Sequence, residues 1–495
     1  MRRLNRFVNM LLVIVLLSFL LGVAVFVRTT TAAYRGDRGF TALPLRFDPD
    51  TSSSEYRAPD RDVLVTVRGG FVKGLMENDG GRDIVVRALS PLPGLRVEGG
   101  DIGGLSLILE NVAPDFYAKR AAGGALLMTK EAVNRVRITV PQGAGGVAEL
   151  APSDDEREFP FVILGDNRDG YETFAEIVQQ VNGEAPAFII ANGDFVYSGR
   201  PNQYRLFDEA LSRFSATVCT VPGNHDIRND GRGIYTMLYG PSHYSFDLGG
   251  CHFVFLDSSP GWLEERAISE EQYQWLERDL GRARGKRIFV TTHIPPEDPR
   301  HGPASADIPN YTSEAWRRER WTEEKLNDYM ESRLLNHGFR DPKEAERFEQ
   351  LMSAYHVDTV YTSHIHSYLE YTRGNVKYMV TGGAGAELLS RDSYHHYVVV
   401  RLGSPDMVRV VELPSPLNTY LARFAATAGL FATAIYRENR TAVLLLGVAA
   451  SLLVVVLLVK LYLKGKGPID TFARWALDTG RYGVRHFREL FGKGK

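Results

Sequence analysis

The sequence contains few cysteines and no excess of positive charge. Cys219 and Cys251 are the only cysteines among 495 residues, which leaves room for at most one disulfide bond. They could pair in an oxidising compartment, but each lies beside a β-rich run and fits equally well as a small core residue. The net charge of -2 and the absence of a long Lys/Arg run in the central part argue against a nucleic-acid-binding protein.

Charged residues are also absent from two long apolar runs, residues 7–27 and 441–459. At about 1.5 Å per residue each run is long enough to cross about 30 Å of hydrocarbon, so both are interpreted as transmembrane helices. A cleaved signal peptide is the alternative for the first run, because small residues follow it. Its apolar part exceeds the usual ~7–15 residues of such peptides, however, and an uncleaved anchor over residues 1–33 is expected.

Basic residues flank both apolar runs on the side away from the central part of the chain. Under the positive-inside rule both termini are therefore cytoplasmic, and 460–495 is a basic cytoplasmic tail. The part between them is expected in the periplasm or outside the cell, on a protein of the cytoplasmic membrane. A weaker apolar stretch, residues 417–436, is interrupted by Arg423 and is interpreted as an interfacial helix. The flanking basic residues are Arg2, Arg3, Arg6, Lys460, Lys464 and Lys466.

The part outside the apolar runs divides into two regions. Residues 62–150 alternate short β-type runs with Gly-rich turns, which predicts a small, mostly antiparallel β domain with one short helix near 114–119. It carries no His or Cys, and we interpret it as a spacer or recognition module. Residues 159–413 alternate strands with helical patterns, which predicts an α/β domain. Ser269 and Gln272 have the spacing of a capping box at the start of one helix.

Five apolar runs of the α/β region end in Asp, Asn or His. In α/β sheets ligands bind at the carboxyl ends of the strands, so these residues are expected to meet at one edge. The runs end at the motifs Gly165-Asp166, Gly193-Asp194-Phe195-Val196-Tyr197, Gly223-Asn224-His225-Asp226, His293 and Ser363-His364-Ile365-His366.

The seven candidate ligands are two carboxylates, an amide, three imidazoles and a phenol. Such a set without thiolate suits Fe, Mn or Zn, and it is too large for a single four-coordinate ion. It suits two ions that share one carboxylate, an arrangement that hydrolyses phosphate esters. The candidate ligands are Asp166, Asp194, Tyr197, Asn224, His293, His364 and His366.

In this order the five motifs resemble the conserved blocks of the calcineurin-like metallophosphoesterases, and the Tyr of the second motif resembles the purple acid phosphatase branch. The resemblance covers about 159–390. It implies a sandwich of two mixed sheets flanked by helices. It also implies a phosphoesterase in which a metal-bound hydroxide attacks phosphorus, and the two apolar runs would anchor this enzyme in the membrane.

The resemblance further implies a role for each residue. Asp194 would bridge two ions, Fe with Fe, Zn or Mn. His225 would contact the phosphate and protonate the leaving group, and Asp226 would orient His225. One ion would be held by Asp166, Tyr197 and His366, and the other by Asn224, His293 and His364.

The first motif departs from the family pattern. Many members have a His two residues after the Asp, where this chain has Arg168, and a guanidinium cannot bind a cation. Tyr197 is the natural replacement, and its phenolate would favour Fe³⁺. Arg168 itself could contact a substrate phosphate or be a solvated loop residue. Residues 382–385, Gly-Gly-Ala-Gly, lack the pattern of a phosphate loop and are interpreted as close backbone packing beside the site.

Two questions remain open in the sequence. The metal set does not separate phosphomonoesters from phosphodiesters of an envelope lipid, glycan or nucleotide, and residues 295–348 are expected to cover the site and decide between them. A non-catalytic envelope protein with a vestigial site is the other alternative, although the set of ligands is complete. Seven other histidines are interpreted as surface or core residues: His243, His252, His301, His337, His356, His395 and His396.

Overall fold

The computed structural model describes residues 39–414 except 60–61, 79–80, 122–125, 156, 260–266, 301–336, 389–392 and 404, together with 17, 20, 428–430 and parts of 443–454. The chain forms two compact units, Met1–Ala32 with Ile435–Lys495, and Ala33–Ala434. Among the described residues no helix has the length and apolar content to cross a membrane. The expected spans 7–27 and 441–459, the helix over 417–436 and the tail 460–495 lie wholly or largely outside the described residues.

The first half of the larger unit consists of two β-sheets around a shared core. Alternate residues of β3 (Val63–Arg68) are buried, as expected for a strand with one face on the core. The only described helix between these strands is α2 (Pro114–Arg120), which begins at a proline. One sheet has the order β1-β4-β5-β7-β9-β8 and the other β10-β6-β3-β2. The other strands are β1 (Phe40–Ala42), β2 (Ser53–Ala58), β4 (Gly70–Asn78), β5 (Gly81–Ala88), β6 (Gly94–Gly99), β7 (Ser106–Glu110), β8 (Leu127–Ala132), β9 (Arg135–Thr139) and β10 (Gly146–Leu150).

These sheets begin earlier in the chain than the sequence indicated. Strands β1 and β2 precede residue 62, and they pair with β4 and β3. The pairing is antiparallel throughout except between β5 and β7.

The second half contains two mixed sheets, as predicted for an α/β fold. In the first, β11, β12 and β13 are parallel, and the antiparallel strands β20 and β21 complete the order β13-β12-β11-β20-β21. In the second, β15, β16, β17 and β19 are parallel, in the order β14-β15-β16-β17-β19-β18. The strands are β11 (Pro160–Leu164), β12 (Phe188–Asn192), β13 (Thr217–Val221), β14 (Tyr244–Leu248), β15 (Cys251–Leu256), β16 (Arg287–Thr292), β17 (Thr359–Thr362), β18 (Tyr368–Arg373), β19 (Val376–Thr381), β20 (His395–Arg401) and β21 (Met407–Leu413).

An aromatic core joins the two mixed sheets. Phe161 and Phe188 of the first sheet stack at 5.0 Å, and the edge of Phe253 from the second sheet meets Phe188 at 4.9 Å. Cys219 and Cys251 belong to this core as free, buried thiols, so they act as core residues and not as a disulfide.

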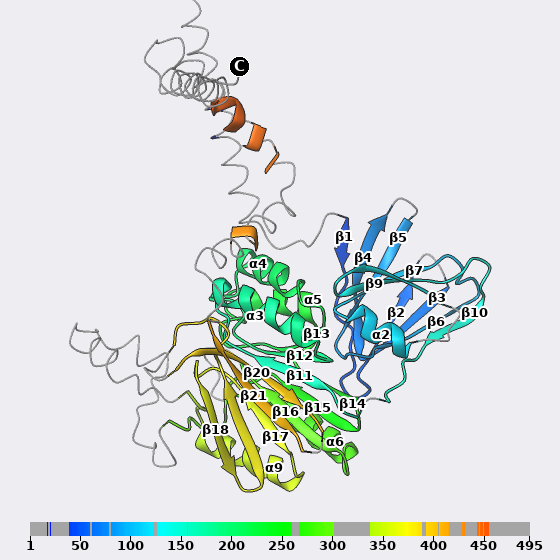
Figure 1. Ribbon diagram of the computed structural model, residues 1–495. Helices are drawn as coiled ribbons and strands as arrows, with labels where there is room; N and C mark the ends of the chain where they lie inside the picture. The colour runs from blue at the N-terminus through cyan, green and yellow to red at the C-terminus, as the bar shows by residue number, and fades with distance from the viewer. Residues whose placement is uncertain are drawn as a thin grey trace, which may run out of the picture. The chain divides into compact units, whose positions relative to one another are not determined.

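Helices cover the outer face of each mixed sheet (Figure 1). Phe174, Ile177 and Val181 recur at helical spacing on α3, and all are buried against the first sheet. The helices on this sheet are α3 (Tyr171–Glu184), α4 (Pro201–Leu211) and α5 (Gly231–Tyr239), and those on the second are α6 (Glu270–Arg282) and α9 (Pro342–Ala354).

Only half of the predicted capping box is present at α6. The Ser269 hydroxyl accepts a hydrogen bond from the Gln272 backbone N–H. The Gln272 side chain instead bonds the backbone of Asp257, accepting from its N–H and donating to its carbonyl. Gln272 thus ties the helix to the end of β15.

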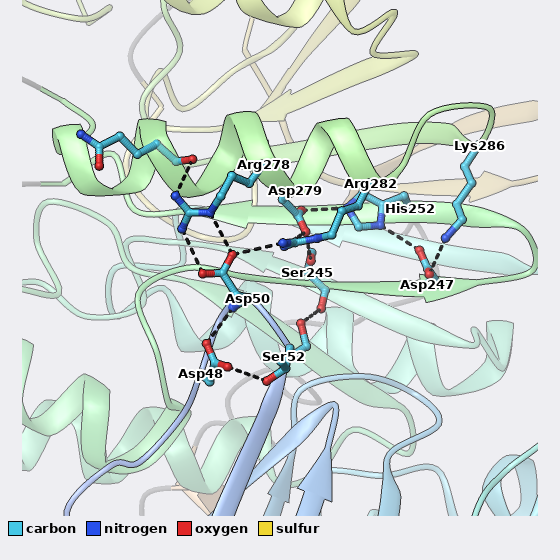
Figure 2. A network of polar contacts seen from close by, with 12 residues as sticks. Asp48, Asp50, Ser52, Ser245, Asp247, His252, Arg278, Asp279, Arg282 and Lys286 are labelled. Carbon is cyan, nitrogen blue, oxygen red and sulfur yellow. Dashed lines mark hydrogen bonds and ion pairs between the residues drawn. The ribbon is translucent and has the colours of Figure 1, made fainter.

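Polar contacts hold the β region against the α/β region. The Asn111 side chain bonds both the N–H and the carbonyl of Val218 and thereby pairs with the edge strand β13. In a second network (Figure 2), Asp50 accepts hydrogen bonds from Arg278 and Arg282 of α6, and Ser52 donates to the Ser245 carbonyl. These bonds explain why the two regions form one compact unit.

Candidate metal centre

The five predicted motifs follow strands β11, β12, β13, β16 and β17 at their carboxyl ends. Since β11, β12 and β13 are parallel, as are β16 and β17, each sheet delivers its motifs to a single edge. Four of the candidate ligands have a left-handed backbone, an unusual conformation for residues other than glycine. The φ angles are 59° at Asp166, 54° at Asp194, 69° at His364 and 52° at His366. Such strain is concentrated at functional sites in proteins.

The glycines of the motifs let the ligands converge. A Cβ at Gly193 would lie 2.5 Å from His293 Nδ1, and one at Gly223 would lie 2.2 Å from Asp194 Oδ1. At Gly382 it would lie 2.4 Å from Asp166 Oδ2, and at Gly383 it would lie 2.1 Å from His396 Nδ1. Residues 382–385 therefore provide close backbone packing beside the site, as predicted.

The candidate ligands form two groups that share one carboxylate. Asp194, His293 and His364 place one ligand atom each within 4.8 Å of one another, and so do Asp166, Asp194 and His366. Asp194 Oδ1 lies 3.4 Å from His293 Nε2, and Asp166 Oδ1 lies 3.6 Å from His366 Nε2. The structure thus brings together five of the seven predicted ligands around Asp194.

Several buried ligand atoms have no hydrogen-bond partner among the described residues. Burial without a partner is costly for such atoms, so a cluster of them that face one another fits the binding of a cation. Asn224 follows Gly223 directly, and its amide oxygen is another buried atom of this kind. The atoms are Asp166 Oδ1, Asp194 Oδ2, Asn224 Oδ1, His293 Nε2 and His364 Nδ1.

The histidine rings are oriented as metal ligands. His293 Nδ1 donates to the Asn192 carbonyl at 2.8 Å, and His366 Nδ1 donates to the Glu387 carbonyl at 2.6 Å. Each ring therefore directs the lone pair of Nε2 towards the carboxylates. Burial, together with the nearby Arg168, lowers the pKa of His366 to about 3, so this ring is in the neutral form that metals require.

The two carboxylates lie in a buried, charge-coupled environment. Burial and the neighbouring Asp194 raise the pKa of Asp166 well above its ordinary value. Burial opposes ionisation of Asp194 as well, but His293, His225 and Arg168 outweigh it and hold the pKa of Asp194 below its ordinary value. A cation between the two carboxylates would relieve their repulsion.

Tyr197 is placed differently from the other candidate ligands. Tyr197 is 53% exposed, whereas the other six candidate ligands are buried or half-buried. The ring instead lies 5.5 Å from the His225 ring and 5.4 Å from the Arg168 guanidinium. Tyr197 thus contributes an exposed aromatic surface beside the centre.

Asp226 does not contact the His225 ring, contrary to the expected orienting role. Its Oδ1 accepts hydrogen bonds from the N–H groups of Phe195 and Val196, and its Oδ2 accepts one from Gly223. The carboxylate therefore ties the second motif to the third. A short polar side chain that follows a turn accepts hydrogen bonds from the N–H groups that the fold brings near it. The local sequence does not show which N–H groups these are.

His225 is held by a carbonyl and an arginine. Its Nδ1 donates to the Tyr197 carbonyl at 2.6 Å, and its Nε2 lies 2.9 Å from Arg228 Nη2. A guanidinium only donates, so Nε2 accepts and the ring is neutral. Burial, with Arg168 and Arg228 nearby, lowers the pKa of His225 to about 4. No functional role was predicted for Arg228 from the sequence. Its position two residues after Asp226 is the signal that could have indicated one.

His337 is another residue whose position the sequence did not indicate. Its ring lies 5.3 Å from the His364 ring, and its Nδ1 lies 2.7 Å from Arg300 Nη2. Asp298 bonds both Arg300 and the His337 backbone. Most of the expected lid, residues 301–336, lies outside the described residues, so its ends alone can be placed beside the centre.

Comparison with known proteins agrees with this geometry, because a family model described as calcineurin-like phosphoesterase matches residues 159–368. Residues 159–368 are a calcineurin-like phosphoesterase domain. Its matched range contains every candidate ligand.

Curated relatives align with the phosphoesterase domain. The glycerophosphodiester phosphodiesterase GpdQ of Enterobacter lignolyticus is 29% identical over 140 residues, 25% of this chain and 47% of that protein. The 3',5'-cyclic adenosine monophosphate phosphodiesterase CpdA of Escherichia coli is 26% identical over 27% of this chain and 49% of that protein. Purple acid phosphatase 23 of Arabidopsis thaliana is 24% identical over 42% of this chain and 40% of that protein. The chain thus spans about half or less of the length of each relative.

Proposed function

We propose that this chain is a metal-dependent phosphoesterase that hydrolyses phosphodiesters. The observation that carries the proposal is the pair of ligand groups that share the buried carboxylate of Asp194. A non-catalytic relic would be expected to lose ligands, whereas here oxygen and nitrogen donors converge from both sheets. Metal ions held there would acidify a bound water and neutralise charge on the phosphoryl oxygens.

The chain's own residues supply the remaining chemistry. Asp226 holds the loop that carries Asn224 and His225 against the second motif. His225 stands at the edge of the ligand groups, with Arg228 on its Nε2. A bound phosphate would attract the Arg228 guanidinium and favour protonation of His225, because negative charge nearby stabilises the imidazolium. His225 would then donate this proton to the departing alkoxide.

Two observations favour phosphodiesters over phosphomonoesters as the substrates. GpdQ and CpdA are phosphodiesterases by name. In addition, Tyr197 was the feature of the sequence that favoured the acid phosphatase branch, and its 53% exposed ring faces His225 and Arg168. Support for the monoester alternative comes from the alignment with purple acid phosphatase 23.

The proposed location is the outer side of the cytoplasmic membrane, with the lipid bilayer as a partner. Its support is the pair of apolar runs 7–27 and 441–459 and the basic residues that flank them. The test is protease treatment of intact spheroplasts. Digestion of the phosphoesterase domain with retention of a membrane-bound, protected tail is expected, and a fully protected domain would contradict the proposed orientation.

An assay of the purified full-length chain tests the activity. Bis(p-nitrophenyl) phosphate and p-nitrophenyl phosphate are offered at several pH values with Mn²⁺, Zn²⁺ or Fe²⁺. Hydrolysis of the diester is expected, with a loss in His225→Ala much smaller than the about 10²–10⁴-fold expected for esters with alkyl leaving groups. The matched control is His356→Asn, at an exposed histidine with a left-handed backbone that Asn tolerates. Failure to hydrolyse either ester with any of the ions would leave the non-catalytic alternative standing.

A further inference from the structure

The two ligand groups are not equivalent, and Arg168 is the reason. In the group at His293 both imidazoles have a ring nitrogen without a hydrogen-bond partner among the described residues, His293 Nε2 and His364 Nδ1, as do the oxygens Asp166 Oδ1, Asp194 Oδ2 and Asn224 Oδ1. At the Asp166 end, His366 Nε2 faces Arg168 Nη1 at 3.2 Å. Because His366 Nδ1 already donates to the Glu387 carbonyl, Nε2 accepts from the guanidinium, and its lone pair is engaged.

Arg168 is fixed in this position by several contacts. Its backbone N–H donates to the Asp194 carbonyl at 2.9 Å, and its side chain is 11% exposed. The guanidinium lies 3.2 Å from a Glu387 carboxylate oxygen and 5.4 Å from the Tyr197 ring. Glu387 therefore holds both partners, His366 through its carbonyl and Arg168 through its carboxylate.

A guanidinium at this place excludes a cation on electrostatic grounds. It carries a positive charge and five N–H donors but no lone pair, so it cannot serve as a ligand. A divalent ion at Asp166 and His366 would have to displace it from His366 Nε2 and would meet its charge within a buried site, where screening is weak. The same charge already acts on both carboxylates, since Arg168 favours the ionised forms of Asp166 and Asp194.

We propose that Arg168 takes the place of one metal ion, so that the centre holds a single resident ion. The inference rests on the proposed function, because it assigns charges within the same site. The resident ion would be bound by four donors, two oxygens and two nitrogens, which suits Zn²⁺ or Mn²⁺. The donors are Asp194, Asn224, His293 and His364. Arg168 would supply the second positive charge to a phosphoryl oxygen of the substrate, as arginine commonly does.

The stoichiometry of metal binding tests this assignment. The purified full-length chain is stripped with a chelator and titrated with Mn²⁺, and bound ion is measured by mass spectrometry and electron paramagnetic resonance. About one equivalent per chain is expected, with the spectrum of an isolated ion. In Arg168→His, which restores an imidazole to the first motif, about two equivalents are expected, with the spectrum of a spin-coupled pair. Arg168→Lys should keep the single ion.

The control for adventitious binding to a new imidazole is Arg284→His, at an exposed arginine in the turn that follows α6, which should bind the wild-type amount of metal. Two spin-coupled ions in the wild-type chain would overturn the inference whether or not the variants fold. If the wild-type chain binds two spin-coupled ions and also hydrolyses phosphate esters, the proposed function is retained and only the proposed role of Arg168 is wrong. Absence of both metal binding and hydrolysis would end both proposals.

Discussion

Gly223 lies against the carboxylate of Asp194, so closely that a Cβ at residue 223 would be 2.2 Å from Asp194 Oδ1 and 2.2 Å from the Asp194 backbone nitrogen. Asp194 is the carboxylate shared by both ligand groups. The glycine that starts the third motif is therefore needed by the second motif, because only a residue without a side chain lets the two loops approach this closely.

Replacement of Gly223 by Ala should move Asp194 and lower kcat/KM about 10²-fold, the cost of roughly 1 Å of misplacement in a catalytic site. Metal affinity should fall in parallel, as measured by titration of the stripped protein. The matched control is Gly233→Ala on α5, where an added Cβ would meet nothing within 4 Å. It should keep full activity and raise the free energy of unfolding by about 0.5–1 kcal/mol. Equal effects of the two substitutions would contradict the role of Gly223.

Asp226→Asn should destabilise the site without altering proton donation. One of the carboxylate oxygens becomes an NH₂ group, so at least one of the N–H groups of Phe195, Val196 and Gly223 loses its acceptor. An unpaired buried N–H costs about 1–3 kcal/mol, to be read from denaturant unfolding. The ratio of rates for good and poor leaving groups should stay at the wild-type value. A changed ratio would restore the orienting role that the sequence suggested.

His225→Ala should change the ratio of rates for good and poor leaving groups, which Asp226→Asn leaves at the wild-type value. Loss of a proton donor slows substrates in proportion to the basicity of their leaving groups. Alkyl esters should therefore lose about 10²–10⁴-fold, and p-nitrophenyl esters should lose much less. The measurement is kcat for a series of diesters with leaving groups of increasing pKa. An equal loss across the series would mean that His225 binds the phosphate but does not donate a proton.

Stability should depend on pH through His252, which bonds Asp247 at one ring nitrogen and Asp279 at the other, each at 2.8 Å (Figure 2). Burial opposes the charged ring, but these two carboxylates outweigh it and raise the pKa of His252. Protonated His252 thus stabilises the fold below the unfolded value of about 6.5, and this contribution is lost as the pH rises through the higher folded pKa.

The expected loss is about 1.4 kcal/mol for each unit by which the pKa is raised. It is measured as the difference in free energy of unfolding between wild-type protein and His252→Gln at pH values from about 6 to 9. The difference should shrink as the pH increases. A constant difference would show that the ring is neutral in the folded protein over this range.

The sequence predicted the strands that carry the site because their ends combine two independent signals. Runs such as residues 159–164 and 187–191 are apolar throughout, which is typical of strands buried on both faces, and Gly-Asp follows the first directly and the second after Asn192. Because neighbouring parallel strands end at the same edge of a sheet, the motifs that follow them are expected to meet there. The structure confirms an α/β fold with mixed sheets. Strand β1 was missed because it is only three residues long, and β2 because its sequence, Ser-Ser-Glu-Tyr-Arg-Ala, is mostly polar and shows no apolar alternation.

Side-chain directions at the site could not be predicted in the same way. Tyr197, His225 and Asp226 all follow turns, where no periodicity fixes the direction of a side chain. Apart from Arg228 beside His225, their partners come from distant parts of the chain or from backbone groups, which sequence spacing does not encode. Arg168 illustrates the limit: the sequence showed that it cannot be a ligand, and only the structure placed it on His366 Nε2.

The most direct test of the central claim is the metal dependence of hydrolysis. The purified full-length chain is assayed with bis(p-nitrophenyl) phosphate before chelation, after chelation and after return of Mn²⁺, beside the variant Asp194→Asn, which lacks the shared carboxylate. We predict that chelation abolishes hydrolysis, that the ion restores it, and that the ion has no effect on Asp194→Asn. Full activity after complete removal of metal, or no activity at any metal loading, would contradict the account.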